Sequence, residues 1–190
     1  KTPRIDQMAA EGVKMMQFNT PAPFCAPTRA SLMTGRYPFR CGMTQNPAPD
    51  GGAEAEALRL PASEVTLAQV MKSAGYATGM VGKWHLGHDA GDLPTARGWD
   101  RALALSQSGA DNWESKPNRL LYERADWTRD GKTARLPRRF YSSTLIVDEA
   151  IGQIDSVPDG RPFFATLGFL ANHIPVQASA ADIAPYTGRY

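Results

Sequence analysis

Hydrophobic positions along the chain follow two different periods, and together they predict an alternation of helices and buried strands. Apolar residues at helical spacing predict helices over residues 3–11, 67–74 and 143–155. Short apolar runs predict strands over residues 13–18, 77–81 and 162–169. The last two runs are apolar enough to be buried on both faces of a sheet. The pattern therefore predicts an α/β domain in which helices flank a mainly parallel central sheet.

Residues with special backbone preferences mark the ends of the predicted helices. Thr66 and Gln69 form a capping-box pattern at the start of the second helix. Ser143 is placed to cap the third helix. Helical spacing then predicts which residues of the third helix are buried, namely Val147, Ala150, Ile151 and Ile154.

Turn-forming residues predict two irregular regions between these elements. Asp130-Gly131 is a common hairpin dipeptide and predicts a β-hairpin over residues 122–134. Pro, Gly, Ala and Glu dominate residues 45–61, which we expect to form an exposed loop.

Composition narrows the class of protein without identifying it. The 190 residues are 42% hydrophobic, which suffices for a sizeable core and argues against a disordered chain. The formal net charge is only +2, and the basic residues are interspersed with acids, which argues against a nucleic-acid partner. No apolar run is long enough to predict a transmembrane segment.

The most specific stretch is residues 23–36, which places a cysteine at the start of a short helix. Pro27 suits the first helical position and Gly35 the residue just past the helix end. The helix N-terminus then faces Cys25, and Arg29 in the first turn can reach the same point. This arrangement favours an anion beside a sulfur atom, although a buried or disulfide-bonded Cys25 fits the residues as well. A bridge to Cys41 would consume the thiol, and we expect Cys41 to be a small buried residue instead.

Three further residues whose side chains can take part in catalysis or binding lie at the ends of predicted strands. Lys83 and His85 follow the strand at 77–81, and they project to the same side if the chain stays extended there. His173 follows the strand at 162–169. Carboxyl ends of parallel strands meet at one sheet edge, where α/β proteins place their chemistry. His88 lies close to His85 in sequence, but we expect it to be a loop residue outside the site.

Several segments resemble the type I sulfatases, and bacterial arylsulfatases in particular. The stretch CAPTRASLMTGRYP resembles the family's C-x-P-x-R signature, and GKWHLG resembles its second signature. PTARGWD at 94–100 and the block from Pro162 to Ala178, with its H-x-P-x-Q-A ending, match further family segments. The loop from Ser106 to Trp113 matches more loosely, so that its candidate pocket-wall residues are Ser106, Ser108 and Asn112.

The resemblance implies a fold and a set of site residues. The fold is the alkaline phosphatase-like α/β sandwich. Cys25 would be oxidised to formylglycine, by a formylglycine-generating enzyme, and its hydrate would be the nucleophile. Arg29 would orient that group, Lys83 would contact the sulfate, His85 would hydrogen-bond the formylglycine and His173 would contact the substrate ester. The implied reaction is hydrolysis of a small sulfate ester, of the aryl sulfate type, to an alcohol or phenol and inorganic sulfate.

The resemblance also implies a divalent cation, usually calcium, and an incomplete chain. Of the family's metal ligands only the formylglycine oxygen at Cys25 is present, because the aspartate pair of the first strand and a later Asp-Asn pair have no counterpart here. We therefore expect residues 1–190 to be part of an N-terminal sulfatase catalytic domain that lacks its first strand and its C-terminal portion. The bacterial character of the resemblance favours the bacterial cytoplasm or periplasm.

Two other functions stay open at the level of sequence. A formylglycine-dependent phosphonate monoester or phosphodiester hydrolase shares the C-x-P-x-R logic and acts on a different ester. A non-catalytic fragment with an unmodified Cys25 would need none of the chemistry above. The residues do not indicate the natural substrate or the oligomeric state.

Overall fold

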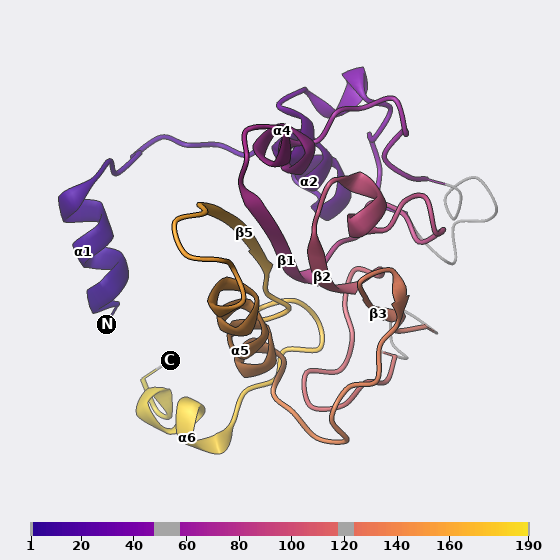
Figure 1. Cartoon of the computed structure of the whole chain (residues 1–190). Helices are drawn as coiled ribbons and strands as arrows, with labels where there is room; N and C mark the ends of the chain where they lie inside the picture. The colour runs from indigo at the N-terminus through magenta and orange to yellow at the C-terminus, as the bar shows by residue number, and fades with distance from the viewer. Residues whose placement is uncertain (1, 48–57, 118–123, 190) are drawn as a thin grey trace.

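The computed structural model describes residues 2–47, 58–117 and 124–189, and its centre is a mixed five-stranded sheet (Figure 1). The strands are β1 (Ala77–Lys83), β2 (Arg101–Leu105), β3 (Trp127–Arg129), β4 (Lys132–Thr133) and β5 (Phe163–Gly168). Their order in the sheet is β4-β3-β2-β1-β5. β1 pairs in parallel with β2 and β5, whereas the β2–β3 and β3–β4 pairs are antiparallel. The three longest strands are thus parallel, as the sequence predicts, and the short hairpin makes the sheet mixed.

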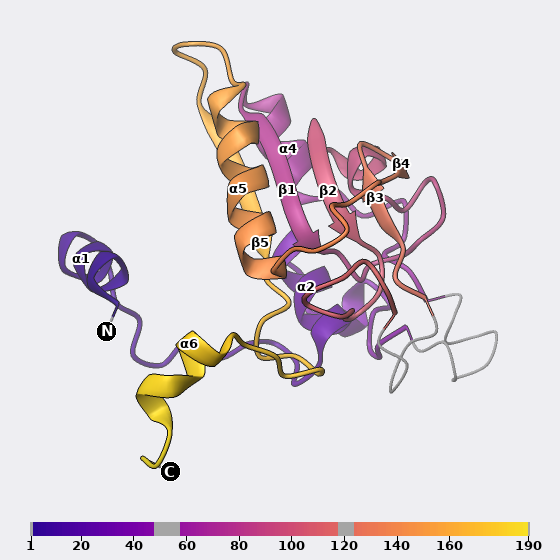
Figure 2. The same cartoon turned by 90° about the horizontal axis from the view of Figure 1, so that it is seen from below.

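Helices cover both faces of the sheet, so the domain has three layers (Figure 2). α2 (Cys25–Thr34) and α4 (Leu67–Ser73) lie on one face, and α5 (Ser142–Asp155) packs on β1 and β5 from the other. Both views show α1 (Pro3–Glu11) and α6 (Ala180–Ile183) apart from the sheet. Three short 3₁₀ helices complete the described elements, at Pro38–Arg40, Pro94–Arg97 and Ala184–Tyr186.

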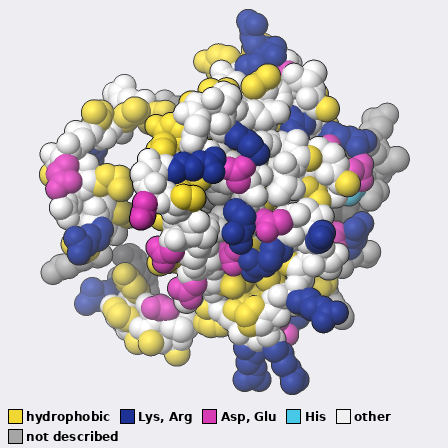
Figure 3. All heavy atoms as spheres, in the orientation of Figure 1, with side chains coloured by type: hydrophobic (Ala, Val, Ile, Leu, Met, Phe, Trp, Pro, Cys, Tyr) yellow, Lys and Arg dark blue, Asp and Glu magenta, His cyan; other side chains and the backbone are white. Residues whose placement is uncertain are grey.

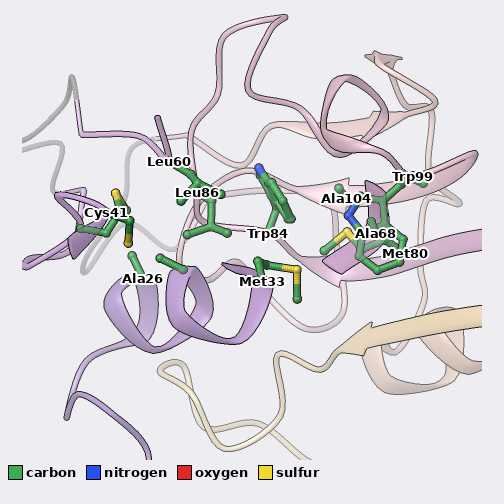
Figure 4. Close-up of a cluster of buried hydrophobic side chains, with 13 residues drawn as sticks. Ala26, Met33, Cys41, Leu60, Ala68, Met80, Trp84, Leu86, Trp99 and Ala104 are labelled. Carbon is green, nitrogen blue, oxygen red and sulfur yellow. The ribbon is translucent and has the colours of Figure 1, made fainter. Parts of the chain in front are cut away.

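Alternate residues of the central strands enter two separate hydrophobic clusters. Met80 and Val81 are neighbours in β1, and each is 1% exposed, but they belong to clusters on opposite faces. On the α2 face, the labelled side chains of Figure 4 pack between α2, α4 and the sheet. Burying each large side chain contributes about 1.5–3 kcal/mol. The cluster on the α2 face fixes β1 and α2 against each other, and these two elements carry most of the predicted site residues.

Two local signals at element ends are confirmed. Thr66 Oγ1 accepts a hydrogen bond from the Gln69 N–H, and Gln69 Oε1 accepts one from the Thr66 N–H, which completes the capping box. Asp130 and Gly131 have φ values of 50° and 80°, so the hairpin turns through two left-handed residues. Residues 122–123 of the predicted hairpin and residues 48–57 of the predicted loop lie outside the described residues.

The predicted strand over residues 13–18 is wrong. Its apolar side chains are 67–84% exposed, namely those of Val13, Met15, Met16 and Phe18. Within the described ranges, no strand includes or pairs with this segment. A strand is stable only when a neighbour accepts its backbone hydrogen bonds, and local composition does not supply that neighbour.

On the α5 face of the sheet, the predicted burial of β5 is also wrong, and the predicted burial of α5 is right only for Ala150. β5 lies at the sheet edge, and Phe163 and Leu167 are 49% and 37% exposed, so this strand is not buried on both faces.

α5 begins at Ser142 after Tyr141, with no side-chain cap from Ser143. Its buried residues are Ser142, Ile146, Ala150 and Gln153, while Val147 and Ile151 are exposed. The buried stripe is shifted by one residue because the helix packs across both β1 and β5.

The arginine of the PTARGWD segment has a structural role. Arg97 is 3% exposed, and its guanidinium donates to the backbone carbonyls of Leu60, Pro61 and Glu64. These bonds fix the end of the 45–61 region to the 3₁₀ helix at Pro94–Arg97. Burial of a charge is tolerated here because several acceptors surround it.

The surface carries both signs of charge. Lys and Arg side chains are interspersed with Asp and Glu over the face shown in Figure 3. In the part of the chain that the structure describes, no helix has the length and apolar character needed to cross a membrane.

Candidate active site

Cys25 is the first residue of α2, which corrects the prediction that the helix begins at Pro27. Phe24 is the residue before the helix, and Gly35 ends it in the left-handed conformation that was predicted, with φ of 67°. Pro27 therefore occupies the third helical position. Proline is tolerated throughout the first turn because none of these N–H groups has an intrahelical partner.

The N–H groups of the first turn are mostly occupied. The Ala26 N–H donates to Asn46 Oδ1 at 2.9 Å, Pro27 has no N–H, and the Thr28 N–H donates to the Phe24 carbonyl at 3.3 Å. The backbone of this helix end is thus less open to an anion than the sequence suggests. Side chains must supply most of the positive charge around Cys25.

Arg29 and Lys83 supply that charge. Arg29 Nη1 donates to the Lys83 carbonyl oxygen at 2.6 Å, which ties α2 to the C-terminal end of β1. Lys83 is the last residue of β1 and is 4% exposed. Its ammonium and the Arg29 guanidinium both act on the Cys25 thiol. Two cations thus lie beside the sulfur, as the sequence predicts.

Ser108 joins three of the predicted site residues. Its Oγ lies 2.9 Å from Lys83 Nζ, 3.2 Å from His173 Nε2 and 3.9 Å from Cys25 Sγ. The side chain is 1% exposed and sits in the loop that follows β2. Sequence reasoning named Ser108 only as a wall residue of a pocket, because a lone loop serine has no local signal for such a position.

His173 is held by its own neighbours in the loop after β5. Its Nδ1 lies 2.9 Å from the Ile174 carbonyl oxygen, which can only accept, so Nδ1 carries the hydrogen. Nε2 is the atom that faces Ser108. His173 and Lys83 therefore approach Ser108 from two different strand ends.

His85 is buried next to this group, but not in the extended backbone conformation that was expected for it. The chain does not stay extended after Lys83, since His85 has φ of 59°. Its Nε2 lies 3.4 Å from the Pro47 carbonyl, and its Nδ1 is buried with no partner among the described residues. The charges of Lys83 and Arg29 reach the ring. His85 is therefore close to the cations and retains one unused nitrogen.

A cavity of about 490 Å³ opens at this point, at the C-terminal ends of β1 and β5. Four predicted site residues are among those that line it, namely Cys25, Arg29, Lys83 and His173. The volume is typical of a small-molecule site. None of the three wall residues predicted from sequence is among its lining residues. Ser108 is buried and bonded to Lys83, Ser106 lines a separate cavity beside Trp127, and Asn112 is buried in a hydrogen-bond network.

The charges at the cavity change the acidity of Cys25. Burial raises the pKa of the thiol, but the Lys83 ammonium, a hydrogen bond from Ser108 and the Arg29 guanidinium outweigh it, and the net pKa is lowered. The pKa of Lys83 is also lowered, chiefly by burial and partly by the charge of Arg29. The site thus favours negative charge at the end of side chain 25.

His85 should remain uncharged over the whole physiological range. Burial, together with the charge of Lys83, lowers its pKa to about 3. As the pH falls from 7 to 5, the ring should therefore stay neutral, because this range lies above the lowered pKa. An NMR titration of the imidazole, assigned with His85→Asn, should show no protonation above about pH 4. Asparagine tolerates the positive φ at this position. A midpoint near 6.5 would contradict this description of the site.

The two remaining candidates lie outside the site, as predicted. Cys41 is 3% exposed, and both cysteines are free, so the 25-to-41 disulfide is absent. His88 is exposed and pairs with Asp89 at 3.8 Å.

Comparison with known proteins places the chain in a family. The family model for sulfatases matches residues 1–190. The chain belongs to the sulfatase family. It is 36% identical to an arylsulfatase of Klebsiella aerogenes over 193 aligned residues, which cover the whole chain and 41% of that enzyme. It is 46% identical to human arylsulfatase G over 109 residues, or 56% of the chain and 19% of that protein.

Solved structures confirm the alkaline phosphatase-like fold. The crystal structure of Ps i-CgsB in complex with k-i-k-neocarrahexaose superposes with a TM-score of 0.83 at 28% identity, over 98% of the chain and 43% of that protein. A second structure, of BT4656 with D-glucosamine-2-N,6-O-disulfate, gives a TM-score of 0.74 at 23% identity, a likeness of fold. The chain thus spans about two fifths or less of the relatives named here.

Sulfatases generally carry formylglycine and a divalent metal. The described residues fit the first of these groups but do not form a site for the second. The sulfur of Cys25 stands where a formylglycine oxygen would be, and donors from Lys83 and Ser108 lie beside it, as an oxygen would require. The described residues contain no group of three or more His, Cys, Asp or Glu side chains that could hold a metal.

Proposed function

We propose that the protein to which this chain belongs hydrolyses sulfate esters of the aryl sulfate type. The observation that carries the proposal is the convergence of Cys25, Arg29, Lys83 and His173 on one cavity, with Ser108 linking three of them. Membership of the sulfatase family and the arylsulfatases among its relatives support it.

Position 25 would supply the nucleophile after oxidation of Cys25 to formylglycine by a formylglycine-generating enzyme. The hydrated aldehyde offers two hydroxyls, of which one attacks sulfur and the other later expels sulfate by restoring the aldehyde. The lowered pKa of Cys25 supports this role, because the same cations would favour an oxyanion in place of the thiolate.

Arg29 and Lys83 would hold the charge of the sulfate group. Three sulfate oxygens need donors that are fixed before the substrate arrives, since fixed donors need no reorganisation during the reaction. Arg29 is anchored to the Lys83 carbonyl, and Lys83 Nζ is anchored to Ser108. Both cations are therefore oriented by the protein itself.

The two histidines would divide the proton transfers. His85 is neutral and its Nδ1 has no partner among the described residues, so it can accept the proton of the hydroxyl that expels sulfate. His173 Nε2 faces Ser108, and in the protonated ring it carries a hydrogen that it can donate to the leaving oxygen. The protons thus enter and leave on different residues.

Calcium is the metal that we propose for the complete protein, in line with the divalent metal of the family. The described residues do not form its site, since they supply only the atom at position 25. No step above depends on it. The proposed compartment is the bacterial cytoplasm or periplasm.

A comparison of two esters tests the proposal. The full-length, modified protein should hydrolyse 4-nitrophenyl sulfate with a higher kcat/KM than 4-nitrophenyl phenylphosphonate. A reversed order would assign the site to the phosphonate and phosphodiester hydrolases instead. Lack of turnover of both esters by a protein shown to carry formylglycine would contradict both enzymatic functions.

A further inference from the structure

The loop after β2 is joined to the His173 segment at two points. At one point Ser108 Oγ lies 3.2 Å from His173 Nε2. At the other, Asn112 Nδ2 donates to the Pro175 carbonyl at 3.1 Å, and the Asn112 N–H donates to Gln177 Oε1 at 2.8 Å. The segment that carries His173 is therefore held on both sides of the imidazole.

The bond from Asn112 acts directly on the peptide units that orient the ring. Pro175 follows Ile174, and the Ile174 carbonyl is the acceptor for His173 Nδ1. A shift of the Pro175 carbonyl would move the Ile174 carbonyl with it, because a single residue separates the two groups. Asn112 thus influences both the orientation of the imidazole and the nitrogen that carries its hydrogen.

Asn112 is itself fixed from the opposite side by α5. Ser142 Oγ donates to Asn112 Oδ1, and the Ser142 N–H donates to the Asn112 carbonyl at 2.8 Å. Asn112 is 2% exposed, and both ends of its side-chain amide are bonded. A buried amide that is fully bonded has one orientation, so it can transmit the position of α5 to residues 173–175.

Gly109 provides an independent sign that this loop is fitted to His173. A Cβ added at Gly109 would lie 2.9 Å from His173 Nδ1 and 3.2 Å from the Ile174 carbonyl oxygen. Backbone and imidazole approach each other here as closely as a glycine allows. The loop therefore contacts the ring at Gly109 and anchors its segment at Asn112.

We infer that Asn112 is a positioning residue that holds His173 Nε2 at the leaving-group side of the site. This inference rests on the proposed function, in which His173 serves the leaving oxygen. Loss of the amide should leave binding of the sulfate group to Arg29 and Lys83 intact. It should weaken the step that depends on a correctly placed imidazole.

The activity test uses two esters that differ in their need for a proton. Asn112→Ala should lower kcat for an alkyl sulfate about tenfold more than kcat for 4-nitrophenyl sulfate, because nitrophenolate leaves without protonation. KM for both esters should change less than twofold, within roughly the scatter expected for an untouched binding site. Gly109→Ala should show the same selectivity, since its methyl group displaces the ring. Thr66→Ala is the matched control: it removes a buried hydrogen-bonded side chain of α4 and should affect both esters equally.

A second readout is independent of activity. The imidazole NMR signal of His173, assigned by its loss in His173→Asn, should shift in Asn112→Ala and Gly109→Ala but not in Thr66→Ala. An unchanged signal in Asn112→Ala would overturn the inference, as would equal losses for both esters. If the wild-type protein hydrolyses neither ester, the proposed function fails, and the NMR signal alone still decides whether Asn112 positions His173.

Discussion

Replacement of Cys25 by serine in the full-length enzyme should give one round of phenol release and then a stalled, sulfated protein. A serine hydroxyl can attack sulfur with the help of Arg29 and Lys83, which line the same cavity. It has no second hydroxyl on its carbon from which to expel sulfate, so the covalent ester should accumulate. A burst assay with an aryl sulfate, combined with the intact protein mass, measures both events. We expect one equivalent of phenol or less and a stable sulfate adduct on residue 25.

The chain offers a matched control for this experiment. Cys41 is also a free cysteine, but it is buried in the cluster on the α2 face and lies outside the cavity. Cys41→Ser should turn over many times without an adduct. Sustained turnover by Cys25→Ser would exclude the hydrate mechanism and point to attack by an activated water.

Lys83→Met should lower kcat/KM for an aryl sulfate by about 10²–10³, the usual cost of removing one fixed donor from a developing charge. Folding stability should not fall in parallel. Lys83 is buried next to Arg29, and burial together with this like charge lowers its pKa, so its charge opposes folding in the absence of an anion. Methionine fills a similar volume without the charge.

Chemical denaturation and steady-state kinetics on the same preparations test this prediction. Lys132→Met, in the exposed strand β4, is the control and should change neither quantity. A loss of activity that is matched by a loss in the free energy of unfolding would assign Lys83 a structural role.

Several features set by local sequence were predicted well, although the Ser143 cap and the helix start at Pro27 were not. The capping box at Thr66 and Gln69 needs only four consecutive residues, and the turn at Asp130-Gly131 needs only two residues that tolerate positive φ. β1 was predicted as Ala77–Val81 and extends two residues further, to Lys83. In each case the physical cause lies within the segment itself.

Features set by distant neighbours were not predictable. The apolar residues of β5 predicted a strand that is buried on both faces, yet this strand lies at the edge of the sheet. Whether a strand such as 13–18 forms depends on a partner, which a single segment does not reveal. The α5 stripe was shifted by one residue for the same reason, since the contacts with β1 and β5 decide which residues are buried.

The site residues also divide into those that could be predicted from local sequence and those that depend on distant parts of the chain. The positions of Cys25, Arg29, Lys83 and His173 followed from three family-like segments and from the rule that strand ends converge at one edge. The central place of Ser108 did not, because it depends on how the loop after β2 folds back over β1. The left-handed backbone at His85 was not predictable either, since a positive φ is uncommon for any residue other than glycine.

The chemical state of residue 25 is the central claim, and mass spectrometry of the peptide that contains it tests this claim most directly. The full-length protein should be produced with a formylglycine-generating enzyme and digested, and the peptide spanning Pro23 to Arg29 should be compared with the same peptide made without that enzyme. We predict that the active preparation contains the aldehyde, which reacts with a hydrazine probe, and that turnover of an aryl sulfate rises in proportion to its content. Full turnover by a preparation in which residue 25 is entirely an unmodified thiol would contradict the account.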